Sequence, residues 1–308
     1  MSYGSPDGRQ PGTNEVREAA RERAREIREQ HRKKERRHRA LRNGGIIVGT
    51  LAVIGIVAFV LTSFAHPAGR GPLNMASDGI KIGADLAAVR TAGIAADAKP
   101  VPSSANPSDV IDIQIYVDYL CPNCGAFEQN NGAQLAAWAK SGAATVEIHP
   151  IALLTTKSAG DQYSLRAANA AACVAEFSPD KFFDFHDSLF VGQPKEGQAG
   201  FDDRELISRA QRAGVTNIVK ISDCINHLQF GNWVKAATVR ALNGPLPNSD
   251  VAAVSTTPTI IVNGKQFKYS AGFDPNEFAQ FVQAASGAMY NENSSASPSP
   301  SATPTPAG

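Results

Sequence analysis

The sequence predicts an α/β domain that contains an inserted helical segment and is preceded by one transmembrane helix. Three observations support this prediction. Residues 110–117 alternate apolar and polar side chains and lead, through a Cys-x-x-Cys turn, into a helical pattern. A second strand-like run, 259–262, follows only after a long helical stretch, and residues 46–65 carry no charge. Strict alternation is typical of strands, whereas a repeat near 3.6 residues is typical of helices.

The first 43 residues are rich in Lys and Arg, although the formal net charge of all 308 residues is only +1. Glu and Arg interleave there at a spacing that allows i,i+4 ion pairs along an exposed helix. Basic segments bind nucleic acid or anionic lipid, and the position directly before 46–65 favours a topology signal with lipid contact. We therefore expect 1–43 to be a charged cytoplasmic segment without a nucleic-acid partner.

Residues 46–65 predict a single transmembrane helix, because a helix of this length at about 1.5 Å per residue spans a hydrocarbon core of about 30 Å. Arg36, Arg37, Arg39 and Arg42 precede it and place the N-terminus in the cytoplasm by the positive-inside rule. A cleaved signal peptide is the alternative, but its basic region would exceed forty residues and no Ala-x-Ala site follows. We expect a single-pass cell-membrane anchor, with the rest of the chain extracytoplasmic.

The elements expected after the anchor follow from composition and periodicity. Residues 66–108, rich in Gly, Ala, Pro and Ser, predict a linker with an edge strand near 79–83. The remaining elements, in order, are strand 110–117, helix 122–140, strand 145–149, four or five short helices within 161–242, strands 259–262 and 265–269, and helix 274–285.

These elements group into one α/β unit, 109–158 and 245–288, that is interrupted by an inserted helical domain, 159–244. Residues 291–308 are dominated by Ser, Pro, Thr and Ala, a composition that cannot bury a core, and we expect them to be disordered.

Cys121 and Cys124 stand where the strand ends and the helix begins, with Pro122 and Asn123 between them. The positive end of a helix dipole favours an anion at the helix N-terminus, so Cys121 is the expected attacking thiolate. Cys124 lies one helical turn further on, within reach of a mixed disulfide on Cys121. Pro122 fits the first helical position, where its missing N–H has no partner to lose.

Half of a zinc site and a passive disulfide are the alternatives for this Cys pair. Zinc takes about four ligands, commonly from a second Cys or His pair at short spacing. Cys173 and Cys224 stand alone in the sequence, and His149, His186 and His227 are far from one another. We interpret His149 as a structural strand residue and His186 as a hydrogen-bonded structural imidazole. The strand-to-helix setting therefore favours redox chemistry.

Thr257 and Pro258 precede the strand 259–262, which ends in an Asn-Gly turn. Alone, a Thr-Pro pair before a strand indicates an ordinary loop proline. Together with the Cys-x-x-Cys turn, however, it resembles the cis-proline loop of the thioredoxin superfamily. The resemblance implies a thioredoxin fold, in which Thr257 offers its backbone to the substrate chain beside the reactive cysteine.

The resemblance narrows to the DsbA-like thiol oxidoreductases over residues 108–286. In that family a helical domain is inserted into the thioredoxin fold, and here well over a hundred residues separate Cys124 from Pro258. The segment 181–190, Lys-Phe-Phe-Asp-Phe-His-Asp-Ser-Leu-Phe, is similar to one common in these proteins. The individual motifs are weak signals, whereas their combination is specific.

Two positions depart from the family pattern. Asn123 stands where the best-known strong oxidants have His, so their redox potential does not carry over. Ile115 stands where the prototype places an acid six residues before the first cysteine. Glu128 matches another acidic position of the family and is a candidate to assist proton transfer. Asp118 is a second candidate, although we expect it to be a solvated carboxylate at a strand end.

The remaining cysteines, Cys173 and Cys224, lie in the inserted segment. Some actinobacterial DsbA-like proteins have a structural bridge at comparable spacing, and an oxidising compartment favours pairing. The resemblance therefore implies a Cys173–Cys224 disulfide, while a buried free thiol at Cys173 is the alternative.

The expected function is that of a membrane-anchored, extracytoplasmic thiol:disulfide oxidoreductase that introduces disulfide bonds into exported proteins through Cys121 and Cys124. The resemblance implies thiol-bearing exported proteins as substrates and a quinone-linked membrane oxidase, DsbB-like or vitamin K epoxide reductase-like, as partner, with no bound cofactor or metal. The direction of electron flow depends on the redox potential. A reductase or isomerase of the same fold, and a non-catalytic thioredoxin-fold interaction module, are the alternatives.

Overall fold

The computed structural model describes residues 69–270 and 272–295. The expected cytoplasmic segment 1–43, the expected transmembrane helix 46–65 and the end of the expected disordered tail, 296–308, lie outside these ranges. Within them, no helix combines the length and the apolar character that a membrane crossing requires.

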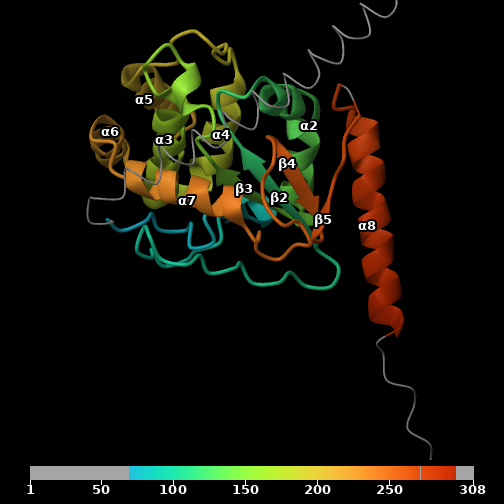
Figure 1. Ribbon diagram of the computed structural model, residues 1–308. Coiled ribbons are helices and arrows are strands. Elements are labelled where there is room, and N and C mark those ends of the chain that lie inside the picture. Colours follow the sequence, from blue (N-terminus) through green and yellow to red (C-terminus); the bar gives the residue numbers. More distant parts are fainter. Residues whose placement is uncertain (1–68, 271, 296–308) are drawn as a thin grey trace, which may run out of the picture. The chain divides into compact units, whose positions relative to one another are not determined.

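A mixed sheet forms the centre of the described part of the chain (Figure 1). Its strand order is β1-β3-β2-β4-β5; β2 and β3 are parallel, and the other neighbours are antiparallel. The strands are β1 (Ile80–Ile82), β2 (Ile111–Val117), β3 (Ala144–Pro150), β4 (Thr259–Val262) and β5 (Lys265–Gln266). This is the predicted α/β thioredoxin fold, and only β5 is clearly shorter than the strand expected at 265–269.

Helix α2 (Pro122–Ser141) joins the parallel strands β2 and β3, as a crossover between parallel strands requires. It packs together with α8 (Pro275–Ser295), since the Phe127 ring lies 5.4 Å from that of Phe278, and with the segment before α8, where the Phe273 ring lies 5.9 Å away. Ile113 and Ile115 of β2, two residues apart and therefore on one face of the strand, are fully buried. The apolar side of the sheet thus holds α2, and with it both cysteines, in place.

The inserted segment forms a group of helices beside the sheet (Figure 1). They are α3 (Tyr163–Phe177), α4 (Phe182–Phe190), α5 (Asp203–Arg212), α6 (Ile218–Asn226) and α7 (Gly231–Asn243), with the short 3-10 helices η2 (Thr155–Lys157) and η3 (Pro179–Lys181). A disulfide bond between Cys173 of α3 and Cys224 of α6 joins two of them. Both sulfur-bearing residues are completely buried.

The prediction of a linker is wrong for residues 70–78, which together with the strand that follows them form the segment 70–82 that we call the N-terminal strap. Asp78 pairs through both carboxylate oxygens with Arg240 of α7, at 2.6 and 2.7 Å. Asn74 donates to the carbonyl of Ala175 in α3 at 2.7 Å, and Met75 is completely buried. The strap ends in β1, the expected edge strand, which pairs with β3. Small residues are abundant here because the strap lies close against its neighbours: a Cβ atom on Gly79 would lie 2.6 Å from the His149 ring.

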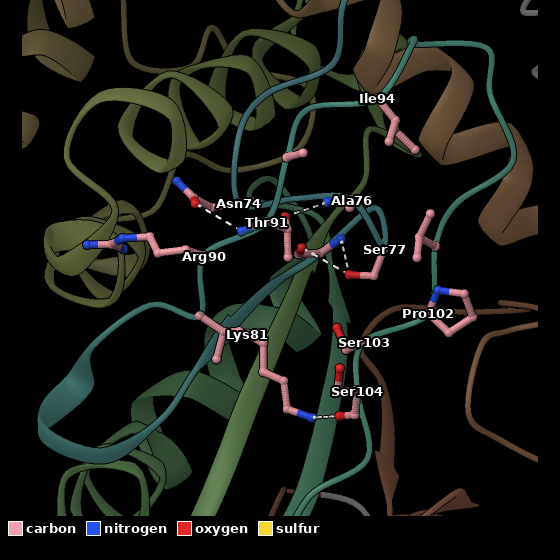
Figure 2. A pocket seen from close by; sticks show the side chains of 14 residues that line it. Asn74, Ala76, Ser77, Lys81, Arg90, Thr91, Ile94, Pro102, Ser103 and Ser104 are labelled. Atoms are coloured by element: carbon pink, nitrogen blue, oxygen red, sulfur yellow. Dashed lines mark hydrogen bonds between the residues drawn. The ribbon is translucent and has the colours of Figure 1, made fainter.

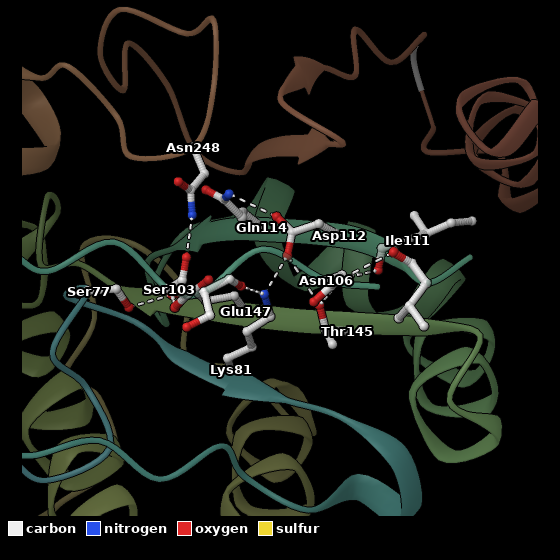
Figure 3. A network of polar contacts seen from close by, with 12 residues as sticks. Ser77, Lys81, Ser103, Asn106, Ile111, Asp112, Gln114, Thr145, Glu147 and Asn248 are labelled. Atoms are coloured by element: carbon white, nitrogen blue, oxygen red, sulfur yellow. Dashed lines mark hydrogen bonds and ion pairs between the residues drawn. The ribbon is translucent and has the colours of Figure 1, made fainter. Parts of the chain in front are cut away.

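Polar side chains connect the strap to the sheet (Figure 3). Glu147 of β3, only 2% exposed, accepts hydrogen bonds from the hydroxyls of Ser77 and Ser103. Lys81 pairs with Asp112 of β2 at 3.0 Å and donates to the carbonyl of Ser104 at 2.9 Å. Since buried charges cost free energy unless they are paired, this network fixes the course of the strap across the sheet.

The final helix is longer than expected, because α8 continues to Ser295 and residues 291–295 are helical. The expectation of disorder from residue 291 is therefore wrong for these residues. Its physical reason lies in the sequence: Ala, Met and Glu are good helix formers, and the first proline of the tail is Pro298.

The Cys173–Cys224 bond is expected to contribute about 4 kcal/mol to the free energy of unfolding, because it closes a loop with a sequence separation of 51. A Cys173→Ala/Cys224→Ala variant, compared with the wild type in urea under non-reducing conditions, should unfold at a correspondingly lower urea concentration. Cys121→Ala/Cys124→Ala is the matched control, which removes two sulfurs and keeps the bridge. A loss below about 1 kcal/mol would show that the bridge is not a main source of stability.

Candidate active site

Cys121 lies between the end of β2 and the first turn of α2, where it is the N-cap residue, and Pro122 occupies the first helical position. It is 6% exposed, whereas Cys124 is completely buried one turn further along the helix. Both are free thiols. The unpaired N–H groups of a helix N-terminus attract an anion, so this position favours a thiolate on Cys121.

The loop before β4 lies directly against Cys121. The peptide bond between Thr257 and Pro258 is cis, and the carbonyl oxygen of Thr257 accepts a hydrogen bond from Cys121 Sγ at 3.3 Å. Strand pairing explains this approach, because Tyr116 near the end of β2 is the register partner of Thr259 at the start of β4. The structure therefore brings together Cys121, Thr257 and Pro258, which the sequence analysis assigned to one site.

The pKa values of the two thiols are shifted in opposite directions. The hydrogen bond from Cys124 is the largest influence on Cys121 and, with the Thr257 side chain, outweighs the effect of burial and lowers the pKa of Cys121 to about 7. Burial raises the pKa of Cys124 well above its ordinary value. At neutral pH, Cys121 is thus the thiol that ionises and Cys124 the one that keeps its proton, which agrees with the roles of attacking and resolving thiol.

Asp118 is not the solvated carboxylate that the sequence suggested, because it is completely buried. Its oxygens accept hydrogen bonds from the backbone N–H groups of Leu120 and Leu154, both at 2.8 Å, and from the Ser164 hydroxyl at 2.7 Å. Burial raises the pKa of Asp118 to about 6 despite these bonds. The negative charge of Asp118 in turn raises the pKa values of Cys121 and Cys124.

Glu128 lies one turn beyond Cys124 on α2 and is 7% exposed. Its Oε1 lies 3.2 Å from Nε2 of the fully buried His186, whose Nδ1 lies 3.1 Å from the Tyr119 hydroxyl. Burial lowers the pKa of His186, but the charge and hydrogen bond of Glu128 outweigh it and leave that pKa raised. His186 is thus a hydrogen-bonded imidazole in a chain of polar groups beneath the Cys pair.

Within the described ranges, one group of side chains is close enough together to hold a metal ion. It consists of Glu128, His186 and Asp187, whose ligand atoms lie within 4.8 Å of one another. The hydrogen bonds on both nitrogens of His186 account for its position without an ion. Neither cysteine belongs to this group, so the zinc alternative for the Cys-x-x-Cys turn gains no ligands from it.

Two residues of the site were not indicated by the sequence. The side-chain amide of Gln193, in the loop after α4, donates to the carbonyl oxygens of Tyr119 at 3.0 Å and Cys121 at 2.9 Å. Tyr269 lies beyond β5; burial, followed by the charges of Cys124 and Cys121, raises its pKa. Neither residue stands in a recognisable spacing from the cysteines, so only the tertiary structure places them at the site.

A cavity of about 290 Å³ lies elsewhere, between the strap, the segment 89–94 and residues 101–104 (Figure 2). Its two basic residues are already paired, Lys81 with Asp112 and Arg90 with Asp180. Neither cysteine lines it, so it is not part of the thiol site.

Comparison with known proteins agrees with this geometry. Residues 106–284, more than half of the chain, match a family model described as Thioredoxin. The reduced form of the disulfide bond oxidoreductase DsbG from Mycobacterium tuberculosis is similar at 29% identity and a TM-score of 0.51, covering 72% of this chain and 95% of that one. Reduced DsbA from the same organism is similar at 30% identity and a TM-score of 0.51, covering 71% and 98%.

Among curated proteins, the serine/threonine-protein kinase PknE of M. tuberculosis is 31% identical over 106 residues, 33% of this chain. The present chain spans only 19% of the length of that kinase. The similarity therefore concerns one part of PknE, and its kinase activity is not carried over.

Alkylation of the reduced protein should show Cys121 titrating with a midpoint of about pH 7, because its pKa is lowered to that value. Asp118→Asn should move this midpoint to lower pH, since the charge of Asp118 opposes ionisation of the thiol. The measurement is the rate of reaction with iodoacetamide against pH, with the site identified by mass spectrometry. Asp223→Asn, at a largely exposed position on α6, is the control, and its midpoint should equal that of the wild type. An unchanged or raised midpoint in Asp118→Asn would contradict the proposed influence of Asp118.

Proposed function

Because this chain belongs to the thioredoxin family and is a thiol–disulfide oxidoreductase of the DsbA type, we propose that it is an oxidase that introduces disulfide bonds into exported proteins. One observation carries the thiol–disulfide chemistry on which the proposal rests: Cys121 lies at the N-terminus of α2 beside the cis Thr257–Pro258 peptide, with its pKa lowered, while Cys124 is completely buried. A lowered pKa stabilises the reduced, thiolate form of the pair, and a stable reduced form makes the oxidised form a better oxidant.

The reaction begins with a disulfide between Cys121 and Cys124. A substrate thiolate attacks Sγ of Cys121, the bond to Cys124 breaks, and Cys124 leaves as a thiolate that takes up a proton because its pKa is well raised. A second substrate thiolate then attacks the substrate sulfur of the mixed disulfide, and Cys121 leaves as a thiolate. The substrate has lost two electrons and two protons, and the enzyme pair holds the two electrons as a reduced dithiol.

The residues around the pair have separate tasks in this reaction. Pro122 and Asn123 are exposed at the start of α2, where a substrate chain passes, and the Thr257 backbone next to Pro258 offers that chain a hydrogen-bonding edge. Asp118 and Glu128 are the buried carboxyl groups near Cys124, and we assign to them the exchange of its proton. A group with a pKa of about 6, as in Asp118, is well matched to proton transfer near neutral pH.

The proposal includes the location and the electron acceptor. The basic segment before residues 46–65 supports a single-pass anchor with the thiol domain outside the cytoplasm. A reduced Cys121–Cys124 pair must be reoxidised in each cycle, and we assign this step to a quinone-linked membrane oxidase of the DsbB or vitamin K epoxide reductase kind.

A second candidate function is a reductase or isomerase, and one observation favours it. A pKa of about 7 for Cys121 equals the value typical of thioredoxin, about 7, rather than that of the strong oxidant DsbA, about 3.5. The equilibrium redox potential decides between the two functions. A potential near about −270 mV indicates a reductase, whereas one near about −120 mV indicates an oxidase.

Oxidative refolding of a reduced, disulfide-containing substrate should require both cysteines. Cys121→Ser should abolish the activity, because no disulfide remains to be attacked. Cys124→Ser should abolish it for the same reason. When it is mixed with a substrate that already carries a disulfide, however, its remaining Cys121 thiolate should attack that bond and accumulate a mixed disulfide, visible on a non-reducing gel, because Cys124 is no longer there to displace the substrate. Wild-type activity in Cys121→Ser would rule out the mechanism, and a redox-inert wild type would indicate a non-catalytic module instead.

The membrane anchor makes a separate prediction. The full chain expressed in bacteria should remain in the membrane fraction after alkaline carbonate washing, and deletion of residues 46–65 should release it. A protease added to intact spheroplasts should degrade the thiol domain of the full chain. Release of the full chain as a shortened product would instead support a cleaved signal peptide.

A further inference from the structure

We propose that Gln193 is a positioning residue for Cys121, whose side-chain amide holds the turn between β2 and α2 in the form that keeps this thiol reactive. The residue belongs to the inserted segment and touches the backbone of the active-site turn. The inference rests on the proposed thiol chemistry but not on the direction of electron flow, so it holds for an oxidase and for a reductase.

The contacts of Gln193 are made to two carbonyls of one turn. Its Nε2 donates to the oxygen of Tyr119 at 3.0 Å and to that of Cys121 at 2.9 Å. A side-chain amide nitrogen carries two protons, so these bonds use its full donor capacity. The Cys121 oxygen also accepts the first hydrogen bond of α2, from the Gly125 N–H at 3.1 Å. Gln193 thus clamps the strand end to the helix start, with Leu120 between the two acceptors.

Gly125 leaves the space that this amide occupies. A Cβ atom on Gly125 would lie 2.1 Å from Oε1 of Gln193, closer than atoms without a bond between them approach. Gly125 lies inside the first turn of α2, where alanine would favour the helix by roughly 1 kcal/mol. The helix therefore gains nothing from a glycine here, whereas the approach of Gln193 requires one.

The loop that carries Gln193 is fixed by bonds that do not involve its side chain. The Gly197 N–H donates to the Lys157 carbonyl at 2.7 Å, and the Gly200 N–H to the Asp161 carboxylate at 2.7 Å. Arg209 of α5 donates to the Val191 carbonyl at 3.0 Å. Because the loop is held at these points, Gln193 meets the turn in a fixed position, and removal of its amide leaves the loop in place.

The reactivity of Cys121 depends on where the turn places its sulfur. Sγ lies 3.3 Å from the Thr257 oxygen and at the N-terminus of α2, and both relations change if the peptide groups of Tyr119 and Cys121 rotate. Two carbonyls that lose their donor also attract water or another donor into the turn. Gln193 does not touch the sulfur in this arrangement; it acts through the backbone of Cys121.

The test is the rate of alkylation of Cys121 by iodoacetamide in the reduced full-length protein, measured against pH beside the free energy of unfolding. Gln193→Ala should lower the rate at pH 7 about tenfold, as expected for the loss of two hydrogen bonds of ordinary strength. Gln193→Glu should lower it at least as far, because a carboxylate has no proton to donate and faces two carbonyl oxygens. Gln198→Ala, at an exposed position in the same loop, is the matched control and should leave the rate unchanged.

A double-mutant cycle with Gly125→Ala makes the test specific. Alone, Gly125→Ala should displace the amide and lower the alkylation rate about as much as Gln193→Ala; in the Gln193→Ala background it should have little further effect. A role in stability only would lower the free energy of unfolding with the alkylation rate and its pH midpoint unchanged, and this result would overturn the proposal. Additive effects of the two substitutions would also overturn it. If Gln193→Ala does not fold, Gly125→Ala decides the question by the same measurements.

The alkylation assay contains no substrate protein, so its outcome is separate from that of the proposed oxidase function. A wild type that fails to oxidise substrates, with the Gln193 effect intact, would overturn only the oxidase. An active oxidase whose Cys121 is alkylated equally fast in all variants would overturn only the role of Gln193.

Discussion

The antiparallel pairing of β2 with β4 is the constraint on which the thiol site depends. The two strands are far apart in the sequence, and their register sets Tyr116 opposite Thr259. This register alone brings the cis Thr257–Pro258 peptide to the end of β2, where Cys121 begins α2. A strand pairing with this register, in a sheet buried on both faces, is difficult to shift because a slip by one residue would turn every side chain of β4 to the other face. The position of the Thr257–Pro258 peptide relative to Cys121 is therefore fixed by the same packing that stabilises the sheet.

Three ionisable side chains are buried in the interior near the Cys pair. Asp118, Glu128 and His186 are almost or completely buried, and each has hydrogen-bond partners in the surrounding helices. In such surroundings charges interact strongly, so the protonation of one group shifts the pKa values of the others. The acidity of Cys121 therefore reflects a balance, in which donors near the sulfur favour the thiolate and the Asp118 charge opposes it.

The sequence predicted those parts of the molecule that depend on local patterns. The strand–turn–helix around Cys121 and the α/β class follow from periodicity, which is a property of neighbouring residues. The burial of Asp118 was not predictable in this way, because it depends on Leu154 and Ser164, which are distant in the chain. The N-terminal strap was mistaken for a linker because its small residues resemble those of flexible segments, whereas here they allow close packing. Gln193 lies in a loop without any pattern, and only its two contacts identify it.

The Cys173–Cys224 bridge means that this protein itself has to be oxidised while it folds. Both cysteines are sealed inside the folded chain, where an external thiol cannot reach them, so their bond has to form while the helices are still open. A newly made copy consequently needs an electron acceptor before it can mature.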